Sequence, residues 1–176
     1  MAGLWSKLFR QGLPNDFAGA LDADEVVLAH AEVRGGGYLV ATTLGLWLPT
    51  GDESGPRRVG WHLISKATWG GGALSVIEAH ESDTAGAAVV LTDQRPRRFG
   101  LDAPGKLPQV VHTKVTGSIL SRHRYGDAWF LQRKVAGQDG VVLQVRPDEG
   151  ADLELVRGIA ADVAAKIEDL RGADKS

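Results

Sequence analysis

Short apolar runs separated by glycine-rich turns fill residues 25–117, and this pattern constrains the fold more than any other feature of the chain. Two of the turns are the glycine triplets Gly35-Gly36-Gly37 and Gly70-Gly71-Gly72. Glycine adopts positive φ without steric cost, which tight hairpin turns require. The apolar runs that flank the triplets are residues 26–32, 38–43, 58–64 and 73–79. The pattern predicts antiparallel hairpins that build a small barrel or sandwich.

Further strands and a helix complete this region. The strands are predicted at residues 45–49, 87–92 and 98–101, the last following the turn at residues 93–96. Pro104 and Pro108 then open a helix, because proline in a first turn loses no intrahelical hydrogen bond. The apolar positions of this helix are Leu107, Val110, Val111, Val115 and Ile119. A sheet structure of seven strands closed by one helix is therefore expected between residues 25 and 118.

A second group of elements follows. Strands are predicted at residues 128–132 and 141–145, with a turn at residues 137–140 between them. A long helix is predicted from about residue 151 to residue 171, and Asp152 and Glu154 suit the positive end of its dipole. Its apolar stripe consists of Leu153, Val156, Ile159, Ala160, Val163, Ile167 and Leu170. This stripe is expected to pack on the two strands, with self-association through the helix as the alternative.

The order of elements resembles the bacterial pleckstrin-homology-like domains. Residues 38–47 look like that family's apolar strand ending in Thr42-Thr43 followed by a second short apolar strand, and residues 58–64 look like the next strand. The resemblance covers about residues 25–118 and implies a PH-like antiparallel barrel of about seven strands capped by a helix. Members of the family bind lipids, peptides and one another. Lipid-binding members place several cations around the first hairpin, whereas this turn carries Arg34 alone, so phosphoinositide binding is not expected.

Composition limits the classes of function. The 176 residues include no cysteine, which excludes disulfides, thiol catalysis and cysteine-based metal sites. The net charge is -2, and no basic run alternates with aromatic residues, so a nucleic-acid partner is not expected. No apolar run approaches the length of about 18 residues of a transmembrane helix, and the N-terminus lacks a secretory pattern. The sequence predicts a cytoplasmic protein.

Catalytic and cofactor motifs are missing from the sequence. It contains no Gly-x-Ser-x-Gly elbow, no phosphate-binding loop and no His-Glu-x-x-His. Histidine occurs at His30, His62, His80, His112 and His123. His30 and Glu32 share a strand face, but a metal site would need further ligands from elsewhere. We therefore expect no catalytic residue, no metal and no cofactor.

The N-terminal segment poses the sharpest functional question. Residues 1–13 have a helical pattern whose apolar face carries Leu4, Trp5, Leu8, Phe9 and Leu13. A helix this short does not persist in water by itself, so it needs a surface to pack on. The preferred surface is the protein's own barrel or a protein partner. A membrane surface, assisted by the few cations of this segment, is the alternative.

Two other sets of residues are candidates for an interaction surface. If Leu46 and Leu48 lie in the core, Trp47 points to the opposite face and marks a possible contact. Trp61 and Trp69 are expected at covered positions unless they line a binding groove. Arginines near the ends of the predicted elements are the other set, at Arg57, Arg58, Arg97 and Arg98, together with Arg95, Arg122 and Arg124. If these ends meet, the arginines form a patch for a phosphate or an acidic peptide, and a solvated surface is the alternative.

The sequence thus predicts an α+β chain with three parts. Residues 1–24 form an amphipathic segment and linker, residues 25–118 a PH-like domain, and residues 119–176 a hairpin and helix packed on it or appended to it. The expected function is a non-catalytic binding module that presents a surface to a protein partner, with self-association also open. Peripheral membrane association through the N-terminal helix is the alternative.

Overall fold

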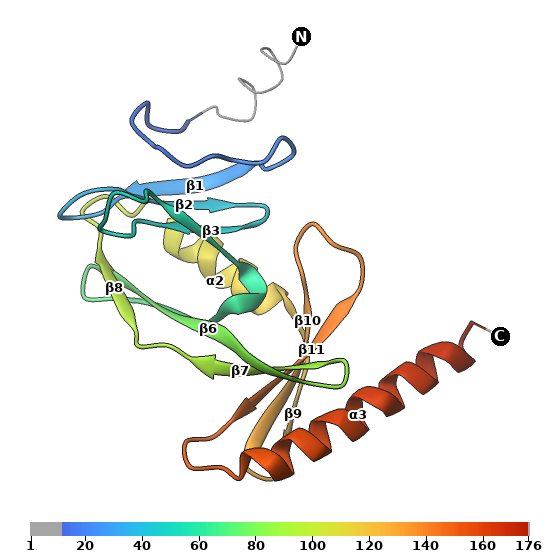
Figure 1. The fold of residues 1–176 in the computed structure, drawn as a ribbon. Coiled ribbons are helices and arrows are strands. Elements are labelled where there is room, and N and C mark those ends of the chain that lie inside the picture. Colours follow the sequence, from blue (N-terminus) through green and yellow to red (C-terminus); the bar gives the residue numbers. More distant parts are fainter. Residues whose placement is uncertain (1–11, 176) are drawn as a thin grey trace. The chain divides into compact units, whose positions relative to one another are not determined.

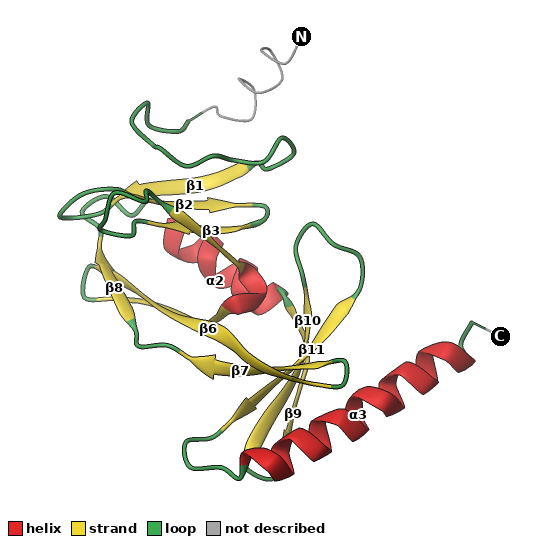
Figure 2. Ribbon diagram, in the orientation of Figure 1, coloured by secondary structure: helices red, strands yellow, loops and turns green. Residues whose placement is uncertain are grey.

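The computed structural model describes residues 12–175 and has an α+β fold, with strands in two hydrogen-bonded sheets and two helices in this part of the chain (Figures 1 and 2). The chain divides into two compact units. The first unit contains the residues up to Glu78 together with Arg95–Gly117. The second unit contains Ala79–Gln94 and the residues from Ser118 onward. Each unit has its own sheet region and its own helix.

The first unit begins with a four-stranded antiparallel sheet in the order β1-β2-β3-β4. Its strands are β1 (Val27–Glu32), β2 (Tyr38–Thr42), β3 (Gly45–Leu48) and β4 (Arg57–Gly60). The turn between β1 and β2 contains Gly35, Gly36 and Gly37, all at positive φ, as the glycine triplet predicts. Leu39, Leu46 and Leu48 are fully buried, so this sheet has a continuous apolar face.

A second group of strands completes the first unit. These are β5 (Ile64–Gly70), the first half of β6 (Ala73–Ala85) and β8 (Arg97–Gly100), with β5 and β8 both antiparallel to β6. Helix α2 (Leu107–Gly117) contacts β5, β1 and β2. It buries Leu107, Val111 and Val115, which confirms most of the apolar stripe expected for this helix.

The single strand predicted at residues 58–64 is wrong. The chain instead forms β4, a 3-10 helix at Trp61–Leu63 (η1), and then β5, in different hydrogen-bonded sheets. Trp61 is only 2% exposed, and its indole nitrogen donates to the Thr42 carbonyl oxygen at 3.0 Å. The short helix turns this large side chain into the core at the point where the chain leaves one sheet for the next.

The second unit is a mixed sheet with a long helix on one face. The second half of β6 and β7 (Ala88–Asp93) form a hairpin, β7 pairs in parallel with β11 (Val141–Pro147), and β10 (Ala128–Lys134) and β9 (Ile119–Tyr125) follow in antiparallel order. Helix α3 (Leu153–Ala173) begins at Asp152, whose carboxylate accepts from the backbone N–H groups of Glu154 and Leu155. This is the usual N-cap arrangement and satisfies two otherwise unpaired donors.

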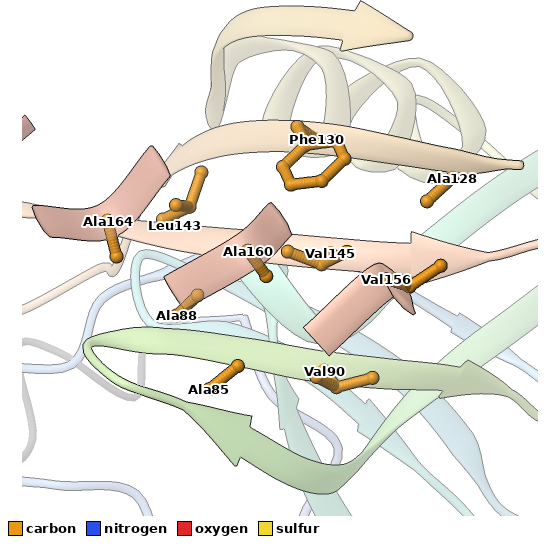
Figure 3. Packing of buried hydrophobic residues seen from close by; sticks show 10 residues of the cluster. All are labelled: Ala85, Ala88, Val90, Ala128, Phe130, Leu143, Val145, Val156, Ala160 and Ala164. Carbon is orange, nitrogen blue, oxygen red and sulfur yellow. The ribbon is translucent and has the colours of Figure 1, made fainter. Parts of the chain in front are cut away.

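Small side chains allow α3 to lie close to the sheet. Val156, Ala160 and Ala164 of the helix pack against residues of β7, β10 and β11, as Figure 3 shows. The strand residues in this cluster are Ala85, Ala88, Val90, Ala128, Phe130, Leu143 and Val145. Packing of the helix stripe on the predicted strands of residues 128–132 and 141–145 is therefore confirmed for its central part, whereas Leu153 and Leu170, predicted in the same stripe, are 56% and 72% exposed.

Three further details differ from the sequence prediction. Ile119, expected in the stripe of α2, instead begins strand β9, which the sequence analysis did not predict. Strand β6 continues past the expected end at Ala79 to Ala85. Strand β8 pairs with β6 and not with β7. As a result, Ala79–Gln94 belong with the C-terminal elements, whereas the sequence analysis placed them in the domain of residues 25–118.

Candidate interaction surfaces

The first candidate surface lies beside the open edge of β5. This strand is the last in its sheet, and within the described residues 12–175 it has a hydrogen-bonded neighbour, β6, on one side only. Ala67 pairs with Val76 and Trp69 pairs with Leu74, so these side chains share a sheet face. Val76 and Leu74 are buried on that face. Trp69 is 43% exposed at the end of the strand.

A groove of about 500 Å³ runs between β5 and the start of α2. Its strand side is formed by Ala67, Thr68, Trp69 and Leu74, and its helix side by Pro104, Gly105, Pro108, Gln109 and His112. No carboxylate, lysine or arginine lines it. The groove therefore offers apolar surface next to backbone N–H and C=O groups that no described strand pairs with. Trp69, which the sequence analysis expected to be covered unless it lined a groove, is the tryptophan that lines one.

Trp47, by contrast, is covered by the protein's own chain. The alternation of β3 is as predicted, since Leu46 and Leu48 are 0% exposed. Trp47 is nevertheless only 7% exposed, because the ring of Phe17 packs edge-on against it at 5.8 Å between ring centroids. The guanidinium of Arg58 lies 5.6 Å from the centroid of the Trp47 ring. Trp47 is thus not available as an exposed contact residue.

Beneath Trp47 lies a buried carboxylate. Glu25 is 0% exposed, and its Oε1 accepts from the Thr42 hydroxyl at 2.5 Å and from the Trp47 indole nitrogen at 2.9 Å. Its Oε2 accepts from the backbone N–H of Asp22 at 3.0 Å and from Arg58 Nη1 at 2.5 Å. Burial acts to lower the pKa of Arg58, but the hydrogen bonds and charges of Asp22 and Glu25 outweigh it and raise that pKa. This network ties the segment before β1 to the sheet, and its four hydrogen bonds occupy both oxygens of the carboxylate.

The four arginines of the candidate patch do not form one free patch. Arg57 donates to both carboxylate oxygens of Glu78 at 3.0 and 2.8 Å, and Arg97 lies 3.7 Å from the same carboxylate. Arg97 also donates to the Pro49 carbonyl oxygen at 2.6 Å. Arg58 is engaged with Asp22 and Glu25. Only Arg98 of the four is exposed without an ion pair to another described residue, so the geometry does not favour an anion site here.

A second candidate surface, which the sequence analysis missed, lies on the unpredicted strand β9. It is the last strand of the second unit's sheet, and Arg122, His123, Arg124 and Tyr125 on it are all exposed. Arg122 and Arg124 lie over Trp129 of the neighbouring strand, with 3.9 and 5.2 Å between guanidinium carbon and ring centroid. The alternating basic residues were visible in the sequence. Their strand was hidden because Ile119 continues the apolar spacing of the preceding helix.

Other features point to no particular ligand. A cavity of about 670 Å³ in the second unit is lined by Arg146 and Arg157 but also by four acidic side chains, namely Asp83, Asp93, Asp148 and Glu149. Leu155 and Leu170 of α3 are 62% and 72% exposed, and nothing in the described structure covers them. Among residues 12–175, no three histidine or carboxylate side chains lie close enough together to hold a metal ion. In the same range no helix is long and apolar enough to cross a membrane.

The N-terminal candidates Leu4, Trp5, Leu8 and Phe9 lie outside the described residues, so docking of this segment on the barrel, on a partner or on a membrane stays a prediction. Comparison of the chain with family models, with curated proteins and with solved structures finds no match.

Proposed function

We propose that this protein is a non-catalytic binding module that holds an extended segment of a partner protein along β5. The observation that carries the proposal is the 43% exposure of Trp69 in a groove of about 500 Å³ beside the open edge of that strand. An extended peptide can add a strand to such an edge, where main-chain hydrogen bonds give affinity and alternate side chains give specificity. The uncharged lining selects for apolar side chains at those positions.

The arrangement of the first unit supports a PH-like assignment of this module. A four-stranded antiparallel sheet, a group of three antiparallel strands and a helix that contacts both β5 and β1 follow one another in the order that the resemblance implies. Residues 79–94, which form the hairpin of β6 and β7, are then an insertion that belongs to the second unit. Peptide binding is one of the functions that such a fold supports, so the assignment is compatible with the groove.

Selection of random displayed peptides on the full chain tests the proposal directly. Enriched peptides are expected to carry apolar residues at alternate positions, because alternate side chains of an added strand face the groove. The bound position is found by NMR, from the protein amide cross-peaks that shift when a selected peptide is added. The shifted cross-peaks are expected to belong to residues 64–70 and 104–112. Substitution of Trp69 by serine should weaken binding about 30-fold or more, since a half-exposed tryptophan in a groove has the properties of a binding hot spot.

Leu170→Ser is the matched control, because it removes an apolar side chain that is even more exposed but lies on α3. Its affinity for the selected peptides should equal that of the unchanged protein. Ala67→Pro provides a second check at the edge of β5. Gly70 and Ala73 close a two-residue turn as a hydrogen-bonded pair, so the alternation of the ladder directs the Ala67 N–H away from β6, and proline at this position cannot donate a hydrogen bond to an added strand. Peptides that bind Trp69→Ser as tightly as the unchanged protein would contradict the proposal.

A further inference from the structure

The open edge of β9 is a second, chemically different place for a partner. Strand β9 ends the order β7-β11-β10-β9, and no strand within residues 12–175 pairs with its outer side. Unpaired N–H and C=O groups along such an edge form a template for another strand, and proteins usually shorten, cover or charge these edges. Strand β9 is seven residues long, so its edge is not a short one.

Positive charge is concentrated along this edge. Arg122 pairs with Leu131 and Arg124 with Trp129, which places both arginines on the same sheet face, next to Trp129. Arg124 forms an ion pair with Asp148. Arg122 is exposed and has no ion pair with another described residue. Its guanidinium is held by the Trp129 ring and keeps its hydrogen-bond donors available for a carboxylate.

The same face carries more positive charge further into the sheet. Arg146 lies opposite Trp129 on β11, and its Nε and Nη2 atoms are buried without a hydrogen-bond partner. Asp93 Oδ1 is 3.7 Å from Nη2, which is beyond hydrogen-bond distance. Burial lowers the pKa of Arg146, Asp93 opposes this effect, and Arg122 lowers that pKa further. Arg122 and Arg146 therefore repel each other, and an acidic group added at this face would relieve the repulsion.

Apolar side chains mark the two ends of the same edge. The pairing of β9 with β10 has an irregularity next to Leu120, and this side chain is 48% exposed. Tyr125 is 50% exposed although its ring packs edge-on against Phe130 at 5.3 Å between ring centroids. Charge alone would protect an edge from aggregation. Exposed leucine and tyrosine on either side of the charge instead add apolar area that a bound segment can cover.

We propose that β9 binds an extended acidic segment of a partner protein, which adds to the sheet with carboxylates beside Arg122 and Arg124 and apolar residues beside Leu120 and Tyr125. The added strand lies about 4.8 Å from β9, so its side chains reach the two arginines directly. Arg146, two strands further in, contributes attraction at longer range. This site is independent of the groove beside β5, because it lies in the other unit and selects for charge instead of apolar surface.

A second copy of this chain is the less suitable occupant. Antiparallel pairing of β9 with its own copy would place the arginines of one strand opposite or diagonal to those of the other. Like charges at such positions destabilise a strand pair. The charge on this edge therefore argues for a partner of opposite charge.

The test uses the full chain and a synthetic peptide that alternates glutamate with valine, with leucine at each end. Affinity is measured by fluorescence polarisation at low and at physiological salt, and the bound position by NMR, where cross-peaks of residues 119–125 are expected to shift. Arg122→Glu should weaken binding about tenfold, because it replaces an attraction by a repulsion at the contact. Arg171→Met, on the helix that covers the other sheet face, is the matched control and should bind as the unchanged protein does.

Two more peptides separate strand addition from simple charge attraction. The same peptide with every backbone nitrogen methylated keeps its charge but cannot donate main-chain hydrogen bonds, and it is expected to lose binding. The peptide with lysine in place of glutamate is also expected not to bind. Equal binding of the methylated peptide, or an unchanged affinity of Arg122→Glu, would overturn the proposal. So would a dimer of the full chain that Leu120→Glu dissociates, because it would show that the edge is occupied by a second copy.

Discussion

Glu25 in the first unit and Arg146 in the second are both charged side chains largely removed from water, and their surroundings differ sharply. Glu25 receives four hydrogen bonds, from Thr42, Trp47, Asp22 and Arg58. Arg146 is 19% exposed, and two of its nitrogen atoms have no hydrogen-bond partner. A buried charge is tolerated when its hydrogen bonds are complete and is costly when they are not.

This difference assigns the two charges different roles. The complete shell around Glu25 connects the segment before β1 to strands β2, β3 and β4, so it holds the first unit together. The shell around Arg146 contains one ion pair, with Asp93 at 3.7 Å, and leaves Nε and Nη2 without a hydrogen-bond partner. Arg133, fully buried on the same sheet, donates from Nε and Nη2 to the Ser118 hydroxyl at 3.0 and 2.6 Å, and burial followed by the charge of Arg146 lowers its pKa to about 10. The sheet face that carries Arg122, Arg124 and Arg146 thus holds positive charge that an acidic partner can compensate.

The largest effect is expected from Glu25→Gln. The neutral amide presents an N–H₂ group where Arg58 or the Asp22 backbone now donates, so at least one buried donor loses its acceptor. Breaking one side of a buried ion pair lowers the free energy of unfolding by about 3–5 kcal/mol. This loss of stability is measured by urea unfolding of the full chain, with tryptophan fluorescence as the signal. Glu32→Gln, at an exposed position on β1, should change stability by about 0.5 kcal/mol or less. Similar curves for the two variants would refute the role of Glu25.

A smaller loss of stability is expected from Phe17→Ala, which removes the ring that covers Trp47 and the hydrogen bonds of Glu25 beneath it. The Phe17 ring fits closely here, since a Cβ atom added to Gly19 would lie 2.4 Å from it. Removal of a half-buried ring and its edge-on contact with Trp47 should lower the free energy of unfolding by about 1–2 kcal/mol. Acrylamide quenching of tryptophan fluorescence should rise as Trp47 becomes accessible. Phe17→Leu, which keeps an apolar cover, should behave nearly as the unchanged protein. A stable Phe17→Ala variant with unchanged quenching would mean that residues 17–25 do not cover Trp47 in solution.

Much of the fold was predictable because local patterns decide it. The glycine triplets, the continuous apolar runs of β2 and β3 and the alanine-rich stripe of α3 each specify one element without reference to distant residues. The exposed face of β6 shows the limit of this approach. Residues 80–84 are polar and exposed, so they read as a loop, yet they pair with β7 through backbone hydrogen bonds that any side chain permits. Alternation is visible only where one face of a strand is buried.

The candidate surfaces were harder to predict than the fold. Trp47 and Trp69 occupy similar apolar runs, but Phe17, distant in sequence, covers one and leaves the other exposed. The sequence does not show that Glu78, distant from both residues along the chain, forms ion pairs with Arg57 and Arg97. Strand β9 was missed because Gly117 ends α2 just before Ile119, and apolar spacing alone cannot show that change. For the tryptophans and for Arg57 and Arg97, the deciding contact joins residues far apart along the chain.

The comparison of Glu25 with Arg146 predicts that Arg146→Met, unlike Glu25→Gln, does not lower the free energy of unfolding. Methionine keeps an apolar stem of similar reach but removes the donors that lack partners and the repulsion with Arg122. Replacing an incompletely paired buried charge by an apolar side chain is often neutral or stabilising. We expect the free energy of unfolding to stay the same or to rise by about 1 kcal/mol, measured by urea unfolding beside Glu25→Gln. A loss of more than about 1 kcal/mol would show that Arg146 is as fully integrated as Glu25, and the two units would no longer differ in this respect.

The smallest effect is expected at an exposed pair, which serves as the reference for both buried charges. Arg34 donates from Nε and Nη2 to Asp102 Oδ1 at 3.1 and 2.5 Å, and this hydrogen bonding, followed by the charge of Arg34, lowers the pKa of Asp102. A lowered carboxyl pKa contributes stability above the ordinary pKa of aspartate, and this contribution is lost as the pH falls through the pKa of the folded state. In Arg34→Met the pKa of Asp102, followed by NMR of its carboxyl carbon, should rise toward its ordinary value. Stability at neutral pH should barely change, because water and salt screen exposed pairs. If this variant instead unfolds as readily as Glu25→Gln, burial is not what distinguishes the charges of this protein.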